Sequence, residues 1–112
     1  GNAYAQRVHN LVRHGRTFVR MGPGPDGEQR VEFKADIGAL AGGVAQIQGV
    51  WTVPDLRGQG IASRAMVTVS QAITAEIVPT VSLYVNEYNV AAVRVYEKAG
   101  FETVGMYSTI LL

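Results

Sequence analysis

The fold is decided by one stretch of the sequence, Val50-Trp51-Thr52-Val53-Pro54-Asp55-Leu56-Arg57-Gly58-Gln59-Gly60-Ile61-Ala62. In this stretch an apolar strand leads into a glycine turn and then into a helix. A helix start leaves its first N–H groups without intrahelical partners, and Gly58 and Gly60 allow left-handed backbone angles and a close approach to a ligand. Because the helix dipole adds partial positive charge there, the stretch predicts a cradle in which main-chain donors hold an anionic pyrophosphate without a metal.

Two well-known phosphate-binding loops also place glycines between a strand and a helix, and this sequence matches neither. A P-loop ends in Gly-Lys-Ser/Thr, whereas Gly60 is followed by Ile61 and Ala62. The dinucleotide-binding fingerprint needs a third glycine where Ser63 stands, and an acidic residue about 20 positions further on, where Glu76 is the nearest. Both of these loop classes are therefore excluded.

A third kind of phosphate loop does match. The hexamer Arg57-Gly58-Gln59-Gly60-Ile61-Ala62 resembles the Q/R-x-x-G-x-G/A segment of the GNAT acetyltransferase superfamily. Residues 81–101 resemble the second signature of that family: a strand, an Asn, a small-residue helix carrying a Tyr, and then Gly-Phe. Two signatures in the expected order are much more specific than one. The resemblance covers about residues 30–112 and extends to an actinobacterial-type group through the segments FKADIGA, QIQGVW and SLYVNEYN.

The resemblance implies an α/β fold with a GNAT-like mixed, mostly antiparallel twisted sheet, flanked by helices on both faces and splayed where the cofactor enters. It implies acetyl-CoA as the acyl donor, and the C-terminal catalytic part of a GNAT protein. The family usually has a first strand and two helices before the hairpin, and only one helix is visible here. Residues 1–112 are therefore expected to form a single acetyl-CoA-binding domain and to be a fragment of a longer protein, missing the first strand and a helix.

The composition limits the class of protein. With 112 residues, 47% of them hydrophobic and 17% charged, the chain suffices for one domain with a real core and not for two. A net charge of +1 without a basic stripe disfavours nucleic acid as a partner. The lack of cysteine excludes a thiolate nucleophile and a Cys-based zinc site. No apolar run approaches 18 residues and no leader is visible, so we expect no membrane partner and a cytoplasmic location.

The N-terminal segment, residues 3–14, has four apolar residues at helical spacing before Gly15, which predicts one amphipathic helix. His9 and His14 lie five positions apart, which is a poor spacing for two ligands on one helix face. We therefore expect surface histidines and no metal site.

The next two strands are expected to form a hairpin. Residues 16–21 and 30–37 are typical of strands, and the segment between them is rich in Gly and Pro. In the second strand apolar and charged residues alternate strictly, which predicts one buried face and one charged, solvated face. The alternative is that Glu32 or Asp36 faces the acceptor cleft and serves as a general base.

Residues 44–53 form the next predicted strand, which Gly49 interrupts. An interior glycine often marks a bulge or a close backbone approach, and the alternative is a continuous buried strand in which it only relieves twist. In the GNAT family the strand at this place bends away from its neighbour, and the pantetheine arm lies along its exposed backbone. The resemblance therefore implies that the main chain of Val50, Trp51 and Thr52 holds the pantetheine and the acetyl carbonyl. The Trp51 side chain fits packing and substrate recognition equally well.

The glycine turn and the following helix supply the other cofactor contacts that the resemblance implies. Apolar residues recur at spacings of three and four from position 61 to 77, which predicts a long packed helix. Arg57 and Arg64 are each expected either to reach a phosphate or to remain surface charges. The expected pyrophosphate-binding residues are Arg57, Gly58, Gln59, Gly60, Ile61, Ala62 and Ser63.

A strand over residues 80–85 and a helix over residues 89–99 carry the second signature. Asn89 is a good N-cap, which would explain it without a ligand, and the resemblance adds that Asn86 or Asn89 hydrogen-bonds the cofactor arm. In the family, the tyrosine at the position of Tyr96 lies beside the CoA sulfur and protonates the leaving thiolate. A core tyrosine with its hydroxyl satisfied is the alternative.

The implied reaction is N-acetyl transfer by direct attack of an amine on acetyl-CoA, because no cysteine is present to carry the acyl group. Strand N–H groups near Trp51 or Thr52 would hold the oxyanion, and Tyr96 would be the acid.

The general base of this reaction is open. Some relatives place a glutamate where Tyr84 stands, and a phenol is no base at neutral pH. A water relay to Glu32, Asp36 or Glu87 would serve, as would an acceptor that arrives neutral.

The acceptor and the assembly also stay open. Small molecules and peptide or protein amines satisfy the same chemistry. Because elements that normally shape the acceptor side are missing, the chain is alternatively a non-catalytic acyl-CoA-binding or sensing module, or the partner half of a larger GNAT protein. It would then pair with a second GNAT-like domain or with its own copy. An interaction domain that retains only the fold is a third possibility.

Overall fold

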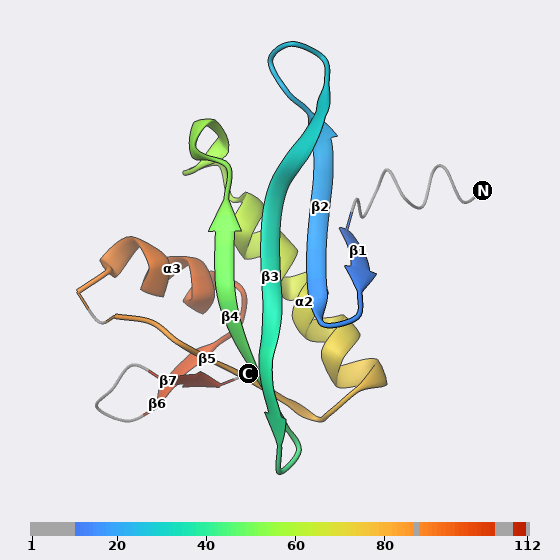
Figure 1. The fold of residues 1–112 in the computed structure, drawn as a ribbon. Helices are drawn as coiled ribbons and strands as arrows, with labels where there is room; N and C mark the ends of the chain where they lie inside the picture. The colour runs from blue at the N-terminus through green and yellow to red at the C-terminus, as the bar shows by residue number, and fades with distance from the viewer. Residues whose placement is uncertain (1–10, 87, 105–108, 112) are drawn as a thin grey trace.

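The computed structural model describes residues 11–86, 88–104 and 109–111, and these form one twisted sheet with two α-helices. Figure 1 shows the elements, and the chain runs through them in the following order. They are β1 (Leu11–His14), β2 (Thr17–Pro23), β3 (Gln29–Ala41), β4 (Val44–Thr52), the 3-10 helix η1 (Pro54–Leu56), α2 (Ile61–Glu76), β5 (Thr80–Tyr84), α3 (Val90–Lys98), β6 (Glu102–Val104) and β7 (Thr109–Leu111).

The described strands form a seven-stranded sheet in the order β1-β2-β3-β4-β5-β7-β6. Every neighbouring pair is antiparallel except β4 and β5, which are parallel and joined through α2. A parallel pair needs such a crossover, because a short turn cannot bring the chain back to the same end of the sheet. The expected α/β fold with a mostly antiparallel mixed sheet and flanking helices is therefore confirmed.

The structure corrects the expected N-terminal helix over residues 3–14. Leu11 to His14 form β1, which pairs antiparallel with β2 through a tight turn at Gly15. Apolar residues on a short segment fit a strand as well as a helix, and pairing with the neighbouring strand decides between them. The rest of the expected helix, including His9, lies outside the described residues.

The expected hairpin is confirmed as β2 and β3, but the alternation along β3 breaks at Glu32. This residue is the extra one in a bulge between the pairs Arg20–Phe33 and Met21–Val31. A bulge places two residues opposite one on the neighbouring strand. Phe33 and Glu32 are consequently both buried, with 0% and 8% of their surface exposed. The expectation of a uniformly solvated charged face is therefore wrong.

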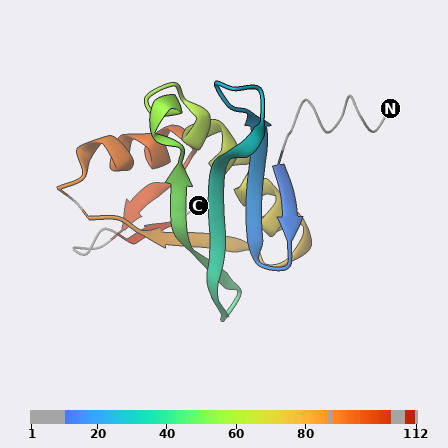
Figure 2. The same cartoon turned by 45° about the horizontal axis from the view of Figure 1, so that its top comes forward.

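The strand β4 separates from β5 half-way along its length. Its pairing with β5 ends at Ile47, while Gln48 to Thr52 continue beside β3 alone. Two residues of β4, Gly49 and Val50, stand opposite one of β3, and Gly49 has a φ of +61°. The predicted bulge is confirmed, and Figures 1 and 2 show β5 turning away from β4 beyond this point. One backbone edge of β4 is therefore left without a strand partner among the described residues.

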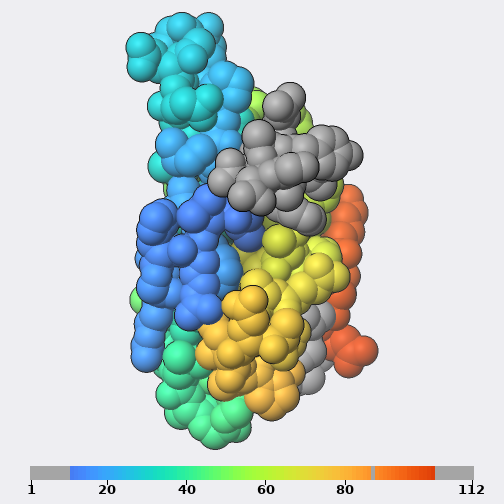
Figure 3. Space-filling model, turned by 90° about the vertical axis from the view of Figure 1, so that its right-hand side faces the viewer, coloured from blue at the N-terminus to red at the C-terminus, as the bar shows by residue number. Residues whose placement is uncertain are grey.

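The core lies between α2 and the sheet. The buried side of α2 carries Ile61, Ala65, Met66, Val69 and Ile73, which repeat at helical spacing. They pack against apolar residues of β2, β3, β4 and β5, and Figure 3 shows α2 in yellow beside β1 and β2 in blue. This packing fixes the start of α2 next to the end of β4, which is where the glycine turn lies.

Candidate acetyl-CoA site

The glycine turn has the backbone geometry of an anion cradle. Gly58 and Gly60 have φ angles of +80° and +81°, which other residues rarely adopt. Gly60 is the N-cap of α2 and has no side chain to cap the helix. Among the described residues, no group accepts a hydrogen bond from the N–H groups of residues 58–63. The positive end of the helix dipole and a row of free donors therefore meet at one point.

The turn faces a cavity of about 670 Å³ between the end of β4 and α3. Most of the residues expected to bind acetyl-CoA line this cavity together, although they come from three separate segments. They are Val50, Trp51, Thr52, Arg57, Gly58, Gly60, Ile61, Ala62, Ser63 and Asn89. Tyr96, the expected acid, lines it as well. A cavity of this size is typical of a small-molecule or cofactor site.

Three side-chain hydrogen bonds hold the turn and the start of α2 in place. The Arg57 Nε donates to the Thr52 carbonyl over 2.8 Å, and the Arg64 Nη1 donates to the Gln59 carbonyl over 3.2 Å. The Ser63 hydroxyl donates to the Val95 carbonyl of α3 over 3.2 Å. In this structure both arginine side chains therefore stabilise the backbone of the turn, and the Ser63 side chain joins the start of α2 to α3.

The helix α3 begins at a capped asparagine and presents Tyr96 to the cavity. The Asn89 side chain accepts from the Ala92 N–H over 3.1 Å, so the predicted N-cap is confirmed. The Tyr96 ring packs edge-on against Phe101 with 6.1 Å between ring centroids. Burial raises the pKa of the Tyr96 phenol above its usual value. The phenol therefore stays protonated across the physiological pH range.

The cavity has a positive lining that the sequence interpretation did not identify. Besides Arg57, the described lining includes Arg94 and Lys98 of α3, and it includes no carboxylate. These two cations lie four residues apart on α3, and that spacing places them on one face of a helix. The same spacing was visible in the sequence and is the signal that could have found them.

Two expected cofactor contacts lie outside the cavity lining. The Gln59 side chain turns away and donates to the Asp55 carbonyl over a long 3.5 Å. The Asn86 side chain accepts from the Tyr88 N–H over 2.9 Å, which forms an Asx turn before α3. In this structure both side chains serve the local backbone.

Of the three acidic candidates for the general base, Glu32 and Asp36 do not line the cavity either, and Glu87 lies outside the described residues. Glu32 accepts from the Arg20 Nε over 3.1 Å, and Arg20 pairs across the strands with the core residue Phe33. Cross-strand partners share a face of the sheet, so the Glu32 carboxylate lies on the side that α2 covers.

Asp36 lies on the opposite face, where both of its oxygens are occupied. Oδ1 accepts from the Thr17 hydroxyl over 2.8 Å, and Oδ2 accepts from the Lys34 ammonium over 2.7 Å. The hydrogen bond from Lys34, followed by that from Thr17, lowers the pKa of Asp36 below its usual value. A carboxylate with a lowered pKa and both oxygens occupied accepts a proton poorly.

A match to a protein-family model shows which family this chain belongs to. The model of the acetyltransferase (GNAT) family matches residues 17–101, which is most of the chain. The chain belongs to the GNAT acetyltransferase family. The match includes both the glycine turn and the helix that carries Tyr96.

One curated protein is similar to the chain in sequence, and two solved structures are similar to it in fold. The chain is 41% identical over 61 residues to a mycothiol acetyltransferase of Brachybacterium faecium, a match that covers 54% of this chain and only 18% of that protein. An aminoglycoside acetyltransferase, AAC(6')-Ib with coenzyme A and kanamycin, is similar in fold at a TM-score of 0.66, with 17% identity over 97% of this chain and 70% of its own. A spermidine N-acetyltransferase of Vibrio cholerae with CoA and spermine has a TM-score of 0.66, with 18% identity over 99% of this chain and 71% of its own.

No group of three or more His, Cys, Asp or Glu side chains among the described residues of the GNAT chain is arranged to hold a metal ion. No helix in that part of the chain is long and apolar enough to cross a membrane.

Proposed function

We propose that the chain is an N-acetyltransferase that transfers the acetyl group of acetyl-CoA directly to an amine. One observation carries this proposal: a single cavity is lined by the free amides of the glycine turn, the unpaired end of β4 and the Tyr96 side chain. These are a phosphate cradle, a backbone edge for an amide-containing arm, and a proton donor. The cytoplasmic location expected from the sequence goes with this proposal, since it suits an enzyme that uses acetyl-CoA.

The pyrophosphate of acetyl-CoA is proposed to bind at the start of α2. The N–H groups of residues 58–63 have no acceptor among the described residues, and the helix dipole favours an anion there. Arg94 and Lys98 add positive charge on the facing wall of the cavity. Without a carboxylate in the described lining, the field in the cavity favours a polyanion.

The pantetheine arm is proposed to lie along β4 as an additional strand. From Gln48 to Thr52 that strand pairs with β3 on one side only, so its other edge has no strand partner among the described residues, although the Thr52 carbonyl accepts from the Arg57 Nε. The two amides of a pantetheine arm can pair with such an edge as an extended peptide does. This arrangement would bring the thioester toward Val50, Trp51 and Thr52, where a strand N–H can hold the oxyanion.

In the proposed reaction the neutral amine attacks the thioester carbonyl and forms a C–N bond. The tetrahedral intermediate then collapses and the C–S bond breaks. Tyr96 donates its phenolic proton to the departing sulfur and is reprotonated from solvent, while the amine nitrogen loses a proton to water. Glu32 and Asp36 are both engaged elsewhere, so water takes the proton that the nitrogen loses after the C–N bond forms. An acceptor that arrives as an ammonium ion must lose one further proton before it attacks. The acceptor amine itself stays open.

The first test is calorimetric titration with acetyl-CoA and, separately, with pantetheine, which lacks the phosphates. We expect acetyl-CoA to bind much more tightly, because the cradle contacts the pyrophosphate. Equal affinity for the two compounds, or no binding of either, would remove the cradle from the proposal.

The second test compares Tyr96→Phe with the wild type in an acetyl-transfer assay against a panel of small amines and peptides. Positioned proton transfer contributes about 10²- to 10⁴-fold, so we expect kcat to fall by about that factor while acetyl-CoA still binds. Tyr84→Phe is the control, since that side chain is exposed and lies outside the cavity lining. Transfer at the wild-type rate by Tyr96→Phe would exclude Tyr96 as the acid. Acetyl-CoA binding without transfer to any amine would favour the non-catalytic module.

A further inference from the structure

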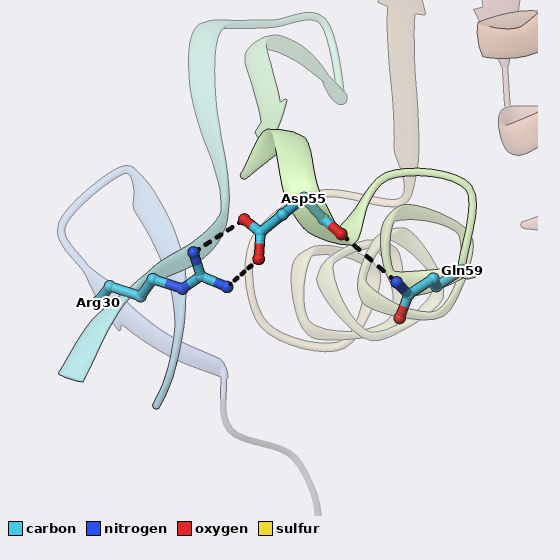
Figure 4. A network of polar contacts seen from close by, with 3 residues as sticks. All are labelled: Arg30, Asp55 and Gln59. Atoms are coloured by element: carbon cyan, nitrogen blue, oxygen red, sulfur yellow. Dashed lines mark hydrogen bonds and ion pairs between the residues drawn. The ribbon is translucent and has the colours of Figure 1, made fainter. Parts of the chain in front are cut away.

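One ion pair joins the β2–β3 hairpin to η1, which leads into the glycine turn at residues 58–60, the proposed phosphate loop. Arg30, at the start of β3, donates from Nη1 to Asp55 Oδ1 over 2.8 Å and from Nη2 to Asp55 Oδ2 over 2.7 Å. Figure 4 shows the two parallel contacts, with Arg30 on β3 and Asp55 on η1. This fork-to-fork geometry fixes the orientation of both groups, which a single contact does not do.

The ion pair lies at the entrance of the phosphate loop. Asp55 is the middle residue of η1, and the first glycine of the loop follows three positions later. Beside it, the Val53 N–H donates to the Glu32 carbonyl of β3 over 2.8 Å. The Asp55 carbonyl also accepts from the Gln59 side chain within the loop. The entrance to the loop is therefore tied to β3 by main chain and by side chain.

The pair also neutralises a carboxylate that stands close to an anion site. Arg30 holds the pKa of Asp55 below its usual value, so the carboxylate is ionised at neutral pH. An unpaired negative charge at this position would repel a phosphate bound by the loop. The Arg30 guanidinium compensates that charge at hydrogen-bonding distance.

We propose that Arg30, acting through Asp55, is a positioning residue for the phosphates of the acyl donor. It holds η1 so that the amides of residues 58–63 point into the cavity, and it removes the charge of Asp55 from their surroundings. The proposal rests on acetyl-CoA binding as set out above. It adds that the β2–β3 hairpin, which contributes no residue to the described lining of the cavity, controls affinity for the phosphates.

The test uses four variants, Arg30→Ala, Asp55→Ala, the double variant and Arg30→Lys, with CoA and pantetheine as the titrated ligands. The positioning role and the charge-compensation role predict different orders of CoA affinity among the variants, so the series distinguishes the two roles. Asp55→Ala removes the ion pair with Arg30 and also removes a negative charge. If Arg30 only compensated the charge of Asp55, this variant would bind CoA at least as tightly as the wild type. Loss of positioning predicts weaker binding. Arg30→Ala removes the ion pair and leaves the Asp55 carboxylate uncompensated, so this variant should bind CoA most weakly.

We expect the dissociation constant for CoA to rise by about threefold in Asp55→Ala and about tenfold in Arg30→Ala, with the double variant between them. Arg30→Lys keeps the charge without the fork and should restore only part of the affinity. Pantetheine binding should not change. The control is Arg13→Ala, which removes a long 3.8 Å surface pair with Glu76, and melting temperatures confirm that every variant folds.

Three outcomes overturn the proposal, and they are distinguishable. Wild-type protein that does not bind CoA removes the proposed function, and the role of Arg30 falls with it. Wild-type protein that binds CoA in a phosphate-dependent way, beside an Asp55→Ala variant of equal or higher affinity, overturns the positioning role alone. Equal weakening of pantetheine binding would also overturn it, because the effect would then not concern the phosphates.

Discussion

Replacing Gly58 and Gly60, the two glycines of the glycine turn, by alanine should separate the effect on stability from the effect on CoA binding. Gly58 and Gly60 have nearly the same positive φ angle, so both substitutions place an L-residue at a φ that L-residues rarely adopt. Their surroundings differ. A β-carbon at Gly58 would have no atom within 4 Å, whereas one at Gly60 would lie 2.8 Å from the Arg64 Nη1.

The expected magnitudes follow from these two surroundings. The left-handed conformation costs an alanine about 1 kcal/mol, and about 1 kcal/mol lowers the melting temperature of a domain of this size by about 4 °C. Gly60→Ala must also move the Arg64 side chain, but this group is exposed and flexible and adds little. Both variants should therefore lose similar stability.

The effect on ligand binding should differ. The methyl group of Gly58→Ala would enter open space at the cavity lining, where the phosphates are proposed to approach the backbone. The methyl group of Gly60→Ala would instead contact the Arg64 side chain. We expect CoA affinity to fall by about tenfold or more for Gly58→Ala, by analogy with the loss that a displacement of about 1 Å causes, and by a few-fold at most for Gly60→Ala.

Thermal unfolding with and without CoA measures both quantities in one experiment. A ligand at about 100 times its dissociation constant stabilises by about 2.7 kcal/mol, so a tenfold loss of affinity removes about half of the shift. Equal CoA-induced shifts in the two variants would refute the reasoning. So would a Gly58→Ala variant that binds CoA like the wild type.

Three further predictions concern individual side chains. Asn89→Ala removes the N-cap of α3 and should lower the free energy of unfolding by about 1 kcal/mol in chemical denaturation, and an unchanged value would contradict the role of the cap. The hydroxyl of Ser70 is buried without a partner among the described residues, so Ser70→Ala should raise stability by about 1 kcal/mol, and a loss would show that the hydroxyl is satisfied. The pKa of Asp36 is lowered in the folded state, so its ionised form stabilises the fold fully above the unfolded value near 4, and this contribution is lost as pH falls through the folded value. The stability difference between wild type and Asp36→Asn should therefore vanish in acid, and a difference independent of pH would exclude this linkage.

The sequence predicted those parts of the site that depend on local structure. Consecutive residues form the strand, the Gly58-Gln59-Gly60 turn and the helix, so their order can be predicted locally. The turn lines the cavity. The N-cap at Asn89 and the bulge at Gly49 are likewise set by one residue and its neighbours. The position of Tyr96 in the cavity lining was predicted from its place on the helix that Asn89 caps, α3.

The sequence did not predict features that depend on distant partners. Leu11 to His14 form a strand because β2 offers them an edge, which their spacing does not reveal. Glu32 is buried because a bulge turns it out of alternation. Arg30 and Asp55 lie 25 positions apart, and only the folded hairpin brings them together. Neither residue type nor spacing contains that information.

The open edge of β4 also bears on how the protein behaves in concentrated solution. An unpaired strand edge is a template for any extended backbone, including that of another molecule of the same sequence. From Gln48 to Thr52 the chain presents such an edge, next to an exposed Trp51. A bound pantetheine arm would cover it. The ligand would then act as a guard against aggregation, and the empty protein should be the form that self-associates.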